Sequence, residues 1–219
     1  MHLSLTGMSG SGKSFWSGLL ARHGFTRFCC DDLIAARLAP GLSGHGDTIA
    51  QLGEWMGFPY QTGYEEREAE YLSLEGETME ESLQMLRSHP GSGAGSIVID
   101  TTGSVIYTGQ EILAELRRLT TIVHLATPSE VQRRMLDSYL SSPRPILWRG
   151  MFEKVPPETD EEALARCYPV LLSSRELLYQ EFADVTVDYF RRRAPEFGVE
   201  EFLSEIQTVA AGKGLLHPG

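Results

Sequence analysis

The clearest chemistry in this sequence lies in residues 7–14, which read Gly-Met-Ser-Gly-Ser-Gly-Lys-Ser. This is the phosphate-loop pattern G-x-x-x-x-G-K-S/T without a gap. Its glycines let backbone N–H groups turn toward phosphate oxygens, and a following helix N-terminus adds partial positive charge. We therefore predict that the loop binds ATP, with Lys13 reaching the β- and γ-phosphates and Ser14 holding Mg²⁺. The residues assigned to the nucleotide are Gly7, Gly10, Ser11, Gly12, Lys13, Ser14 and Phe15.

Carboxylates follow two further apolar stretches of the chain. Asp31 and Asp32 come directly after a short apolar-aromatic segment, and Asp100 ends a β-branched run. Because the carboxyl ends of parallel strands meet at one edge, we expect these groups beside the phosphates. A carboxylate there can accept the proton of an attacking hydroxyl or organise Mg²⁺, and Asp31 and Asp100 are the candidate metal ligands. The alternative for Asp31 is a cap on a helix that begins at Asp32.

Strand and helix patterns alternate around these residues. The expected strands are 2–6, 24–30, 97–100, 121–126 and 183–187. The expected helices are 13–23, a segment ending at 38, 48–55, 64–86, 107–119, one opening at Pro128, 160–182 and 199–210. This alternation predicts an α/β domain with a parallel sheet.

Length, charge and cysteine content limit the class of protein. With 219 residues, 42% of them hydrophobic, we predict a single domain over 1–219. A net charge of −11 argues against nucleic-acid and anionic-membrane partners, which require clustered cations. Three cysteines cannot form a disulfide framework, and no apolar run reaches membrane-spanning length, so we expect a cytoplasmic protein. We expect a monomer or weak homodimer that acts on a small molecule.

The second half of the chain contains an irregular segment rich in proline and arginine. We predict a mobile lid at about 139–160 carrying Arg144 and Arg149, because lids exclude water and bring cations to a transferring phosphoryl group. The alternative is a plain surface loop. The residues 191–193, three consecutive arginines, are predicted to form a solvated turn.

Three further motifs are Gly63 followed by Arg67 and Glu70, the segment 144–147 and the segment 175–184. They resemble the shikimate kinase family. The first is similar to the segment in which that family binds the substrate carboxylate. Residues 144–147, Arg-Pro-Ile-Leu, are similar to the lid signature R-P-L-L. Residues 175–184 resemble R-x-P-L-Y-x-E-x-A-D. Together with the phosphate loop, the resemblance covers most of the chain in the family's order.

The resemblance implies a three-layer α/β/α P-loop fold with about five parallel strands and a substrate-binding segment at about 31–88. It implies transfer of the ATP γ-phosphate to a hydroxyl of a small carboxylated acceptor, with shikimate as the leading candidate. Asp32 would orient the attacking hydroxyl, and Lys13 and Arg144 would be catalytic cations. The other implied contacts are Arg67 and Arg175 with the acceptor carboxylate, Thr102 and Gly103 in the substrate loop, and Arg133 or Arg134 with adenine.

Two motifs depart from the family pattern. Its D-x-D is here Cys30-Asp31-Asp32, so Mg²⁺ organisation would move to Asp31 or Asp100. Its triple glycine is here Thr101-Thr102-Gly103, whose side chains would narrow the substrate site. The alternatives are a kinase of the same fold for a sugar acid, a nucleoside or a dephospho-coenzyme A type of acceptor, and a nucleotide-binding regulatory module with impaired catalysis.

Overall fold

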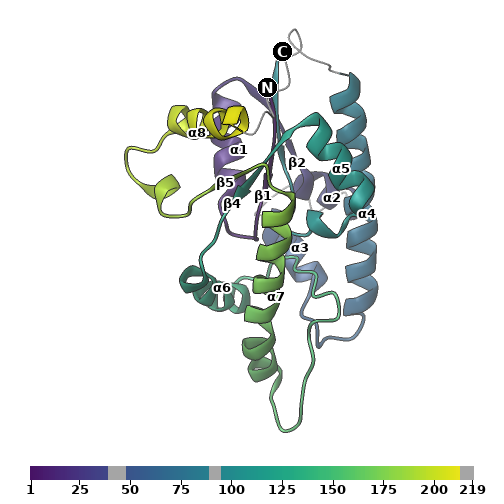
Figure 1. The fold of residues 1–219 in the computed structure, drawn as a ribbon. Helices are drawn as coiled ribbons and strands as arrows, with labels where there is room; N and C mark the ends of the chain where they lie inside the picture. The colour runs from purple at the N-terminus through teal and green to yellow at the C-terminus, as the bar shows by residue number, and fades with distance from the viewer. Residues whose placement is uncertain (39–47, 89–94, 213–219) are drawn as a thin grey trace.

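A computed structural model describes residues 1–38, 48–88 and 95–212 (Figure 1). The strands are β1 (His2–Thr6), β2 (Phe25–Cys29), β3 (Ser96–Asp100), β4 (Thr121–Leu125) and β5 (Val185–Val187). The α-helices are α1 (Lys13–Arg22), α2 (Cys30–Leu38), α3 (Thr48–Met56), α4 (Tyr64–Ser88), α5 (Gln110–Leu119), α6 (Ser129–Ser141), α7 (Asp160–Phe182) and α8 (Val199–Gly212). Two short 3-10 helices are η1 (Val105–Tyr107) and η2 (Arg191–Arg193). Across the described ranges, no helix is long and apolar enough to span a membrane.

The strands form one sheet in the order β2-β3-β1-β4-β5, and every neighbouring pair runs parallel. Parallel neighbours need long crossover connections, which the helices between the strands provide. This arrangement confirms the predicted α/β/α fold with five parallel strands. It also brings the segments that follow β1, β2 and β3 to the same edge of the sheet, where ligands bind in open α/β folds.

Helices cover both faces of the sheet (Figure 1). On one face, Leu3 and Leu5 of β1 belong to a core cluster with Trp16 of α1 and Phe202 of α8. The rings of Trp16 and Phe202 stack with their centroids 4.4 Å apart. On the other face, β3 contributes Ile97 and Ile99 to a larger cluster formed with α4, α5 and α7. Because β3 is buried on both faces, its residues 97–99 read as a continuous apolar run, whereas β1 alternates Leu3 and Leu5 with the buried Ser4.

Two sequence-based boundaries differ from the structure. The helix predicted at 107–119 is divided into η1 and α5, because Gly109 adopts a left-handed φ of 109° that a continuous helix does not allow. The segment predicted as a lid at about 139–160 begins within α6, so the irregular connection spans 142–159. The predicted loops at 40–47 and 89–96 lie mainly outside the described residues.

Candidate active site

The phosphate loop connects β1 to the first turn of α1. Gly7 has a φ of 140°, and a Cβ there would lie 3.0 Å from both the Leu125 carbonyl oxygen and the Ser11 hydroxyl. Lys13 is buried, and its ammonium group donates to the carbonyl oxygens of Gly7 (2.8 Å) and Met8 (3.1 Å). Burial lowers the pKa of Lys13, while the carboxylates of the site oppose that shift. The loop therefore holds a buried ammonium at the place that the sequence predicted.

A pocket of about 180 Å³ opens at this edge of the sheet. We call it the phosphate pocket. It is lined by six residues of the loop and α1, from Ser9 to Phe15, and by Asp31, Ile49, Tyr71, Gly103, Arg144 and Pro145. Four of the predicted site residues, Lys13, Ser14, Asp31 and Arg144, therefore converge on one small cavity from separate elements.

Asp31 is the carboxylate that lines the phosphate pocket, and Asp32 is not among the lining residues. The Tyr71 hydroxyl donates to Asp31 at 3.0 Å. Burial raises the pKa of Asp31 to about 6, with a further contribution from Asp100 and an opposing one from Lys13. Asp32 is exposed to solvent. Since α2 begins at Cys30, Asp31 lies within its first turn, and the alternative of a cap on a helix starting at Asp32 is wrong.

Asp100 is buried at the end of β3 and is largely committed to protein contacts. Its Oδ2 accepts hydrogen bonds from Arg27 (2.7 Å) and Ser17 (2.8 Å), while Oδ1 has no hydrogen-bond partner among the described residues. Mg²⁺ at phosphate sites needs only one or two protein ligands, because waters and phosphates supply the rest. Ser14 and Asp31 line the same pocket and fit that requirement, whereas Asp100 is not among the residues that line it. No group of three metal-ligating side chains occurs in the described ranges.

The structure separates the two arginines assigned to the acceptor. The Arg67 guanidinium donates to the carbonyl oxygens of Met56 (2.9 Å) and Thr62 (3.3 Å), in the turn before α4, and does not line the phosphate pocket. Arg175 is buried, and donates to the carbonyl oxygens of Gly103 (3.4 Å) and Leu147 (2.5 Å). Arg175 therefore borders the pocket through Gly103, and Arg67 stabilises a turn.

The substrate loop after β3 also differs from the expectation. Thr101 and Thr102 are buried; the Thr101 hydroxyl donates to the Leu5 carbonyl (2.8 Å), and the Thr102 hydroxyl contacts that of Ser104 (3.3 Å). Only Gly103 of this loop lines the pocket. The expectation that two threonine side chains narrow the site is wrong, because both hydroxyls bond within the protein.

The central part of the connection 142–159 is packed into the protein. Ile146, Leu147 and Trp148 are at most 3% exposed. The Tyr64 hydroxyl donates to the Ile146 carbonyl (2.6 Å) and accepts from the Trp148 N–H (3.0 Å). In this structure the lid is held by α4 and α7, with Arg144 at the pocket, and its mobility stays a prediction.

Gly53 of α3 makes this packing possible, and we predict that Gly53→Ala disturbs it. A Cβ at Gly53 would lie 2.1 Å from the Pro143 carbonyl oxygen, next to Arg144. We expect a loss of about 1–3 kcal/mol in unfolding free energy, together with a lower kcat because Arg144 moves. Gly76→Ala in α4 is the matched control, since a Cβ there meets nothing within 4 Å. Urea denaturation and steady-state kinetics check both variants, and an unperturbed Gly53→Ala protein would contradict the packing role.

A second cavity of about 430 Å³ adjoins the phosphate loop and is lined from Ser11 to Leu19 on one side and from Arg192 to Phe197 on the other. Arg192 is buried, and donates to the carbonyl oxygens of Ser11 (3.1 Å) and Ala126 (2.7 Å). The prediction of a solvated turn at 191–193 is therefore wrong for Arg192. Arg134 is exposed on α6, and the side chain of Arg133 lies outside the described part of the structure. We call this cavity the nucleotide groove.

Sequence reasoning missed two buried residues of α4, Tyr71 and Glu75. Glu75 is fully buried, and neither carboxyl oxygen makes a hydrogen bond of good geometry within the described residues. Burial raises the pKa of Glu75 to about 8; the nearby Ser104 hydroxyl opposes this shift, the charge of Asp31 adds to it, and Arg175 and Lys13 also oppose it. A signal was present: residues 64, 68, 71 and 75 follow the i, i+4, i+7, i+11 spacing of one helix face.

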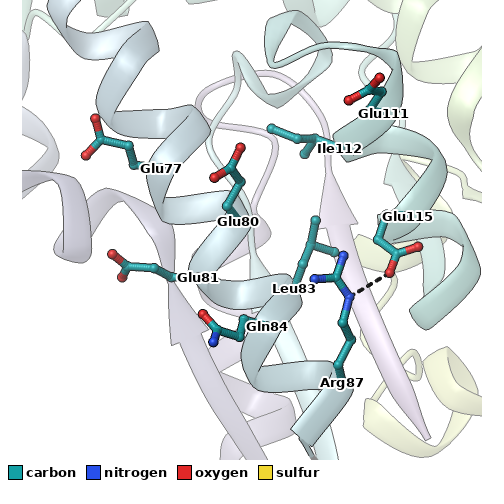
Figure 2. Close-up of a pocket in the computed structure, with 9 residues that line it drawn as sticks. All are labelled: Glu77, Glu80, Glu81, Leu83, Gln84, Arg87, Glu111, Ile112 and Glu115. Atoms are coloured by element: carbon teal, nitrogen blue, oxygen red, sulfur yellow. Dashed lines mark hydrogen bonds and ion pairs between the residues drawn. The ribbon is translucent and has the colours of Figure 1, made fainter.

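A larger groove than the phosphate pocket lies elsewhere, between α4 and α5 (Figure 2). It has a volume of about 550 Å³ and is lined by five glutamates, with Arg87 donating to Glu115 at 2.8 Å. Five carboxylates repel a polyphosphate, so this groove is unsuited to ATP. Volume alone would therefore favour this groove over the phosphate pocket as an ATP site, although its charge is unsuitable.

Comparison with known proteins identifies the fold. No family model and no curated protein matches the sequence. Among solved structures, the shikimate kinase from Acinetobacter baumannii in complex with shikimate matches with a TM-score of 0.55 and 19% identity, covering 99% of this chain and 95% of that one. The shikimate kinase from Bacteroides thetaiotaomicron matches with a TM-score of 0.55 and 18% identity, covering 98% and 99%. The chain therefore has a P-loop kinase fold of the shikimate kinase type.

Proposed function

We propose that this protein transfers the γ-phosphate of ATP, with Mg²⁺, to a hydroxyl group of a small molecule. The observation that carries the proposal is the convergence of Lys13, Asp31 and Arg144 on the phosphate pocket. Phosphoryl transfer depends on positioning and on charge stabilisation, and these three groups supply two cations and a candidate proton acceptor. The resemblance to shikimate kinases in fold supports the same class of reaction.

Each residue has a definite task in this proposal. Bound Mg²⁺ and ATP would supply the phosphoryl group and neutralise part of its charge. Lys13 exchanges its hydrogen bonds with loop carbonyls for phosphate oxygens, and Arg144 stabilises the charge from the lid side. Asp31 accepts the proton of the attacking hydroxyl as the new O–P bond forms and the bond to the leaving ADP breaks.

The nucleotide groove fits the base and ribose of ATP. It shares Gly12 and Phe15 with the phosphate pocket, so a nucleotide whose phosphates occupy the loop extends into it. Its walls include the aromatic rings of Trp16 and Phe197, which provide apolar surface for a base. The contact of Arg133 or Arg134 with adenine that the resemblance implies stays a prediction, since Arg134 does not line the groove and the side chain of Arg133 lies outside the described part of the structure.

The identity of the acceptor is a separate question from the reaction. The sequence predicts a carboxylated acceptor, with shikimate leading, on the basis of Arg67 and Arg175. Of these two arginines, Arg175 borders the phosphate pocket and Arg67 does not. The hypothesis of a carboxylated acceptor is therefore supported by Arg175 and no longer by Arg67. The alternative of a regulatory module with impaired catalysis loses support, because Asp31 lies in the pocket even though Cys30 replaces an aspartate of the family pattern.

A coupled assay of ADP release tests the proposal. We expect ADP formation from Mg·ATP to depend on an acceptor, when hydroxy acids, shikimate, sugars, polyols and nucleosides are supplied separately. ADP formation at the same rate with and without every acceptor would indicate hydrolysis instead of transfer. ATP binding without any turnover would favour the regulatory module.

A further inference from the structure

The three consecutive arginines of η2 point in different directions. Arg191 is exposed and forms an ion pair with Glu205 at 2.7 Å. Arg193 is also exposed, with its guanidinium carbon 3.8 Å from the centre of the Tyr189 ring. Arg192, between them, is only 3% exposed. The short 3-10 helix therefore directs its middle arginine, and not the two beside it, into the protein.

The guanidinium of Arg192 joins three segments that are far apart in the sequence. It donates to the carbonyl oxygens of Val187 (2.9 Å), Ala126 (2.7 Å) and Ser11 (3.1 Å). These belong to the end of β5, to the residue after β4 and to the phosphate loop. Burial and the charge of Arg193 lower the pKa of Arg192 to about 10, so the group keeps its charge at neutral pH. A buried cation therefore holds the phosphate loop against the ends of two strands.

The carbonyl oxygen of Ser11 belongs to a peptide group at the boundary of two cavities. Ser11 and Arg192 line the nucleotide groove, while Gly12 lines both the groove and the phosphate pocket. Because this peptide is trans and planar, the Ser11 carbonyl and the Gly12 N–H point in opposite directions. Gly12 has a φ of 104°, a conformation that glycine adopts readily. With its oxygen held by Arg192 on the groove side, the peptide presents the Gly12 N–H to the opposite side.

We infer that Arg192 is a positioning residue, which fixes the Ser11–Gly12 peptide so that the Gly12 N–H faces the phosphates of the nucleotide. The inference rests on the proposed function and deepens it, since it concerns the loop that would hold ATP. An N–H group that is already oriented stabilises phosphate charge without reorganisation on binding. A carbonyl that accepts from a cation also polarises its own peptide, and this strengthens the N–H as a donor. Arg192 therefore acts through the phosphate loop and not through the base.

Two ligands, one with a base and one without, test this role. Calorimetry measures the Kd of Mg·ADP, and competition against Mg·ADP measures the Kd of Mg·pyrophosphate. We expect Arg192→Ala to raise both Kd values by a similar factor of about tenfold or more. Weaker binding of Mg·ADP alone would place Arg192 at the base and overturn the inference, as would parent affinity for both ligands. Pyrophosphate that does not displace ADP from the parent protein would also overturn it, and a parent that does not bind Mg·ADP would refute the proposed function as well.

Arg191→Ala is the matched control, because Arg191 belongs to the same 3-10 helix and is not among the residues that line the nucleotide groove. It should bind both ligands within about twofold of the parent. Arg192→Lys keeps the charge but replaces the planar guanidinium with a point charge that cannot span three carbonyls, so we expect it to bind about threefold or more weakly than the parent. Thermal unfolding without ligand gives the temperature at which each variant is folded. If Arg192→Ala does not fold, parent affinity in Arg192→Lys would overturn the inference.

The backbone amide of Gly12 gives a readout that a loss of stability alone would not change. In protein carrying isotope-labelled glycine, we expect the Gly12 amide resonance to shift when Mg·ADP saturates the parent or Arg191→Ala. In the folded Arg192 variants, also at saturation, the shift should be less than about half as large, because the peptide is no longer held in the orientation that faces the phosphates. An equal shift in all of these proteins would show that the orientation does not depend on Arg192, and would overturn the inference.

Discussion

Replacing Lys13 with alanine is expected to lower kcat for phosphoryl transfer by about 10²–10³-fold, because the phosphate pocket loses its buried ammonium. The remaining cation of the pocket, Arg144, cannot occupy the position from which Lys13 contacts the loop. Folding should be little affected, since the Lys13 hydrogen bonds in this structure are confined to two loop carbonyls. Single-turnover kinetics with the best acceptor provide the measurement.

Arg22→Ala serves as the control for loss of a cation from the same helix, because Arg22 is exposed at the other end of α1. It should retain the parent kcat. Thermal unfolding of both variants shows whether lost activity reflects lost structure. A Lys13→Ala protein that folds and turns over at the parent rate would contradict the assignment of the phosphate loop.

The second large effect is expected at Asp31. Asp31→Asn keeps the size of the side chain and removes its capacity to accept a proton, so kcat should fall by about 10²–10⁴-fold. Asp32→Asn is the matched control, and we expect it to remain within about twofold of the parent, because Asp32 is exposed and does not line the phosphate pocket. Parallel steady-state kinetics decide the assignment. A larger loss in Asp32→Asn would restore the role that the resemblance to the family gave to that residue.

The fold was predictable because its signals are local and mutually consistent. The phosphate loop lies between a strand with alternating leucines and a helix, and β3 reads as an apolar run because both of its faces are covered. From those signals, all five strands and the long helices could be predicted. The break between η1 and α5 was missed because a single glycine, Gly109, determines it through a left-handed conformation.

The site was less predictable because spacing does not fix the direction of a side chain. Arg67 lies in the first turn of α4, where the preceding turn offers carbonyl oxygens that its guanidinium can bind. Thr102 has a hydroxyl that a neighbouring serine can pair with, so it does not need a ligand. Arg192 reads as a surface cation in a run of three, yet carbonyl oxygens from two other segments surround it. Such partners are distant in sequence and appear only in the fold.

Phosphorus NMR of the protein with Mg·ATP and each acceptor of the ADP-release assay tests the central claim most directly, since it observes the fate of the γ-phosphate itself. We predict that a phosphomonoester resonance of the acceptor grows as ATP is converted to ADP, and that it is absent from the Lys13→Ala protein. Consumption of ATP that yields only inorganic phosphate, or no consumption of ATP with any acceptor, would contradict the assignment of this protein as a small-molecule kinase.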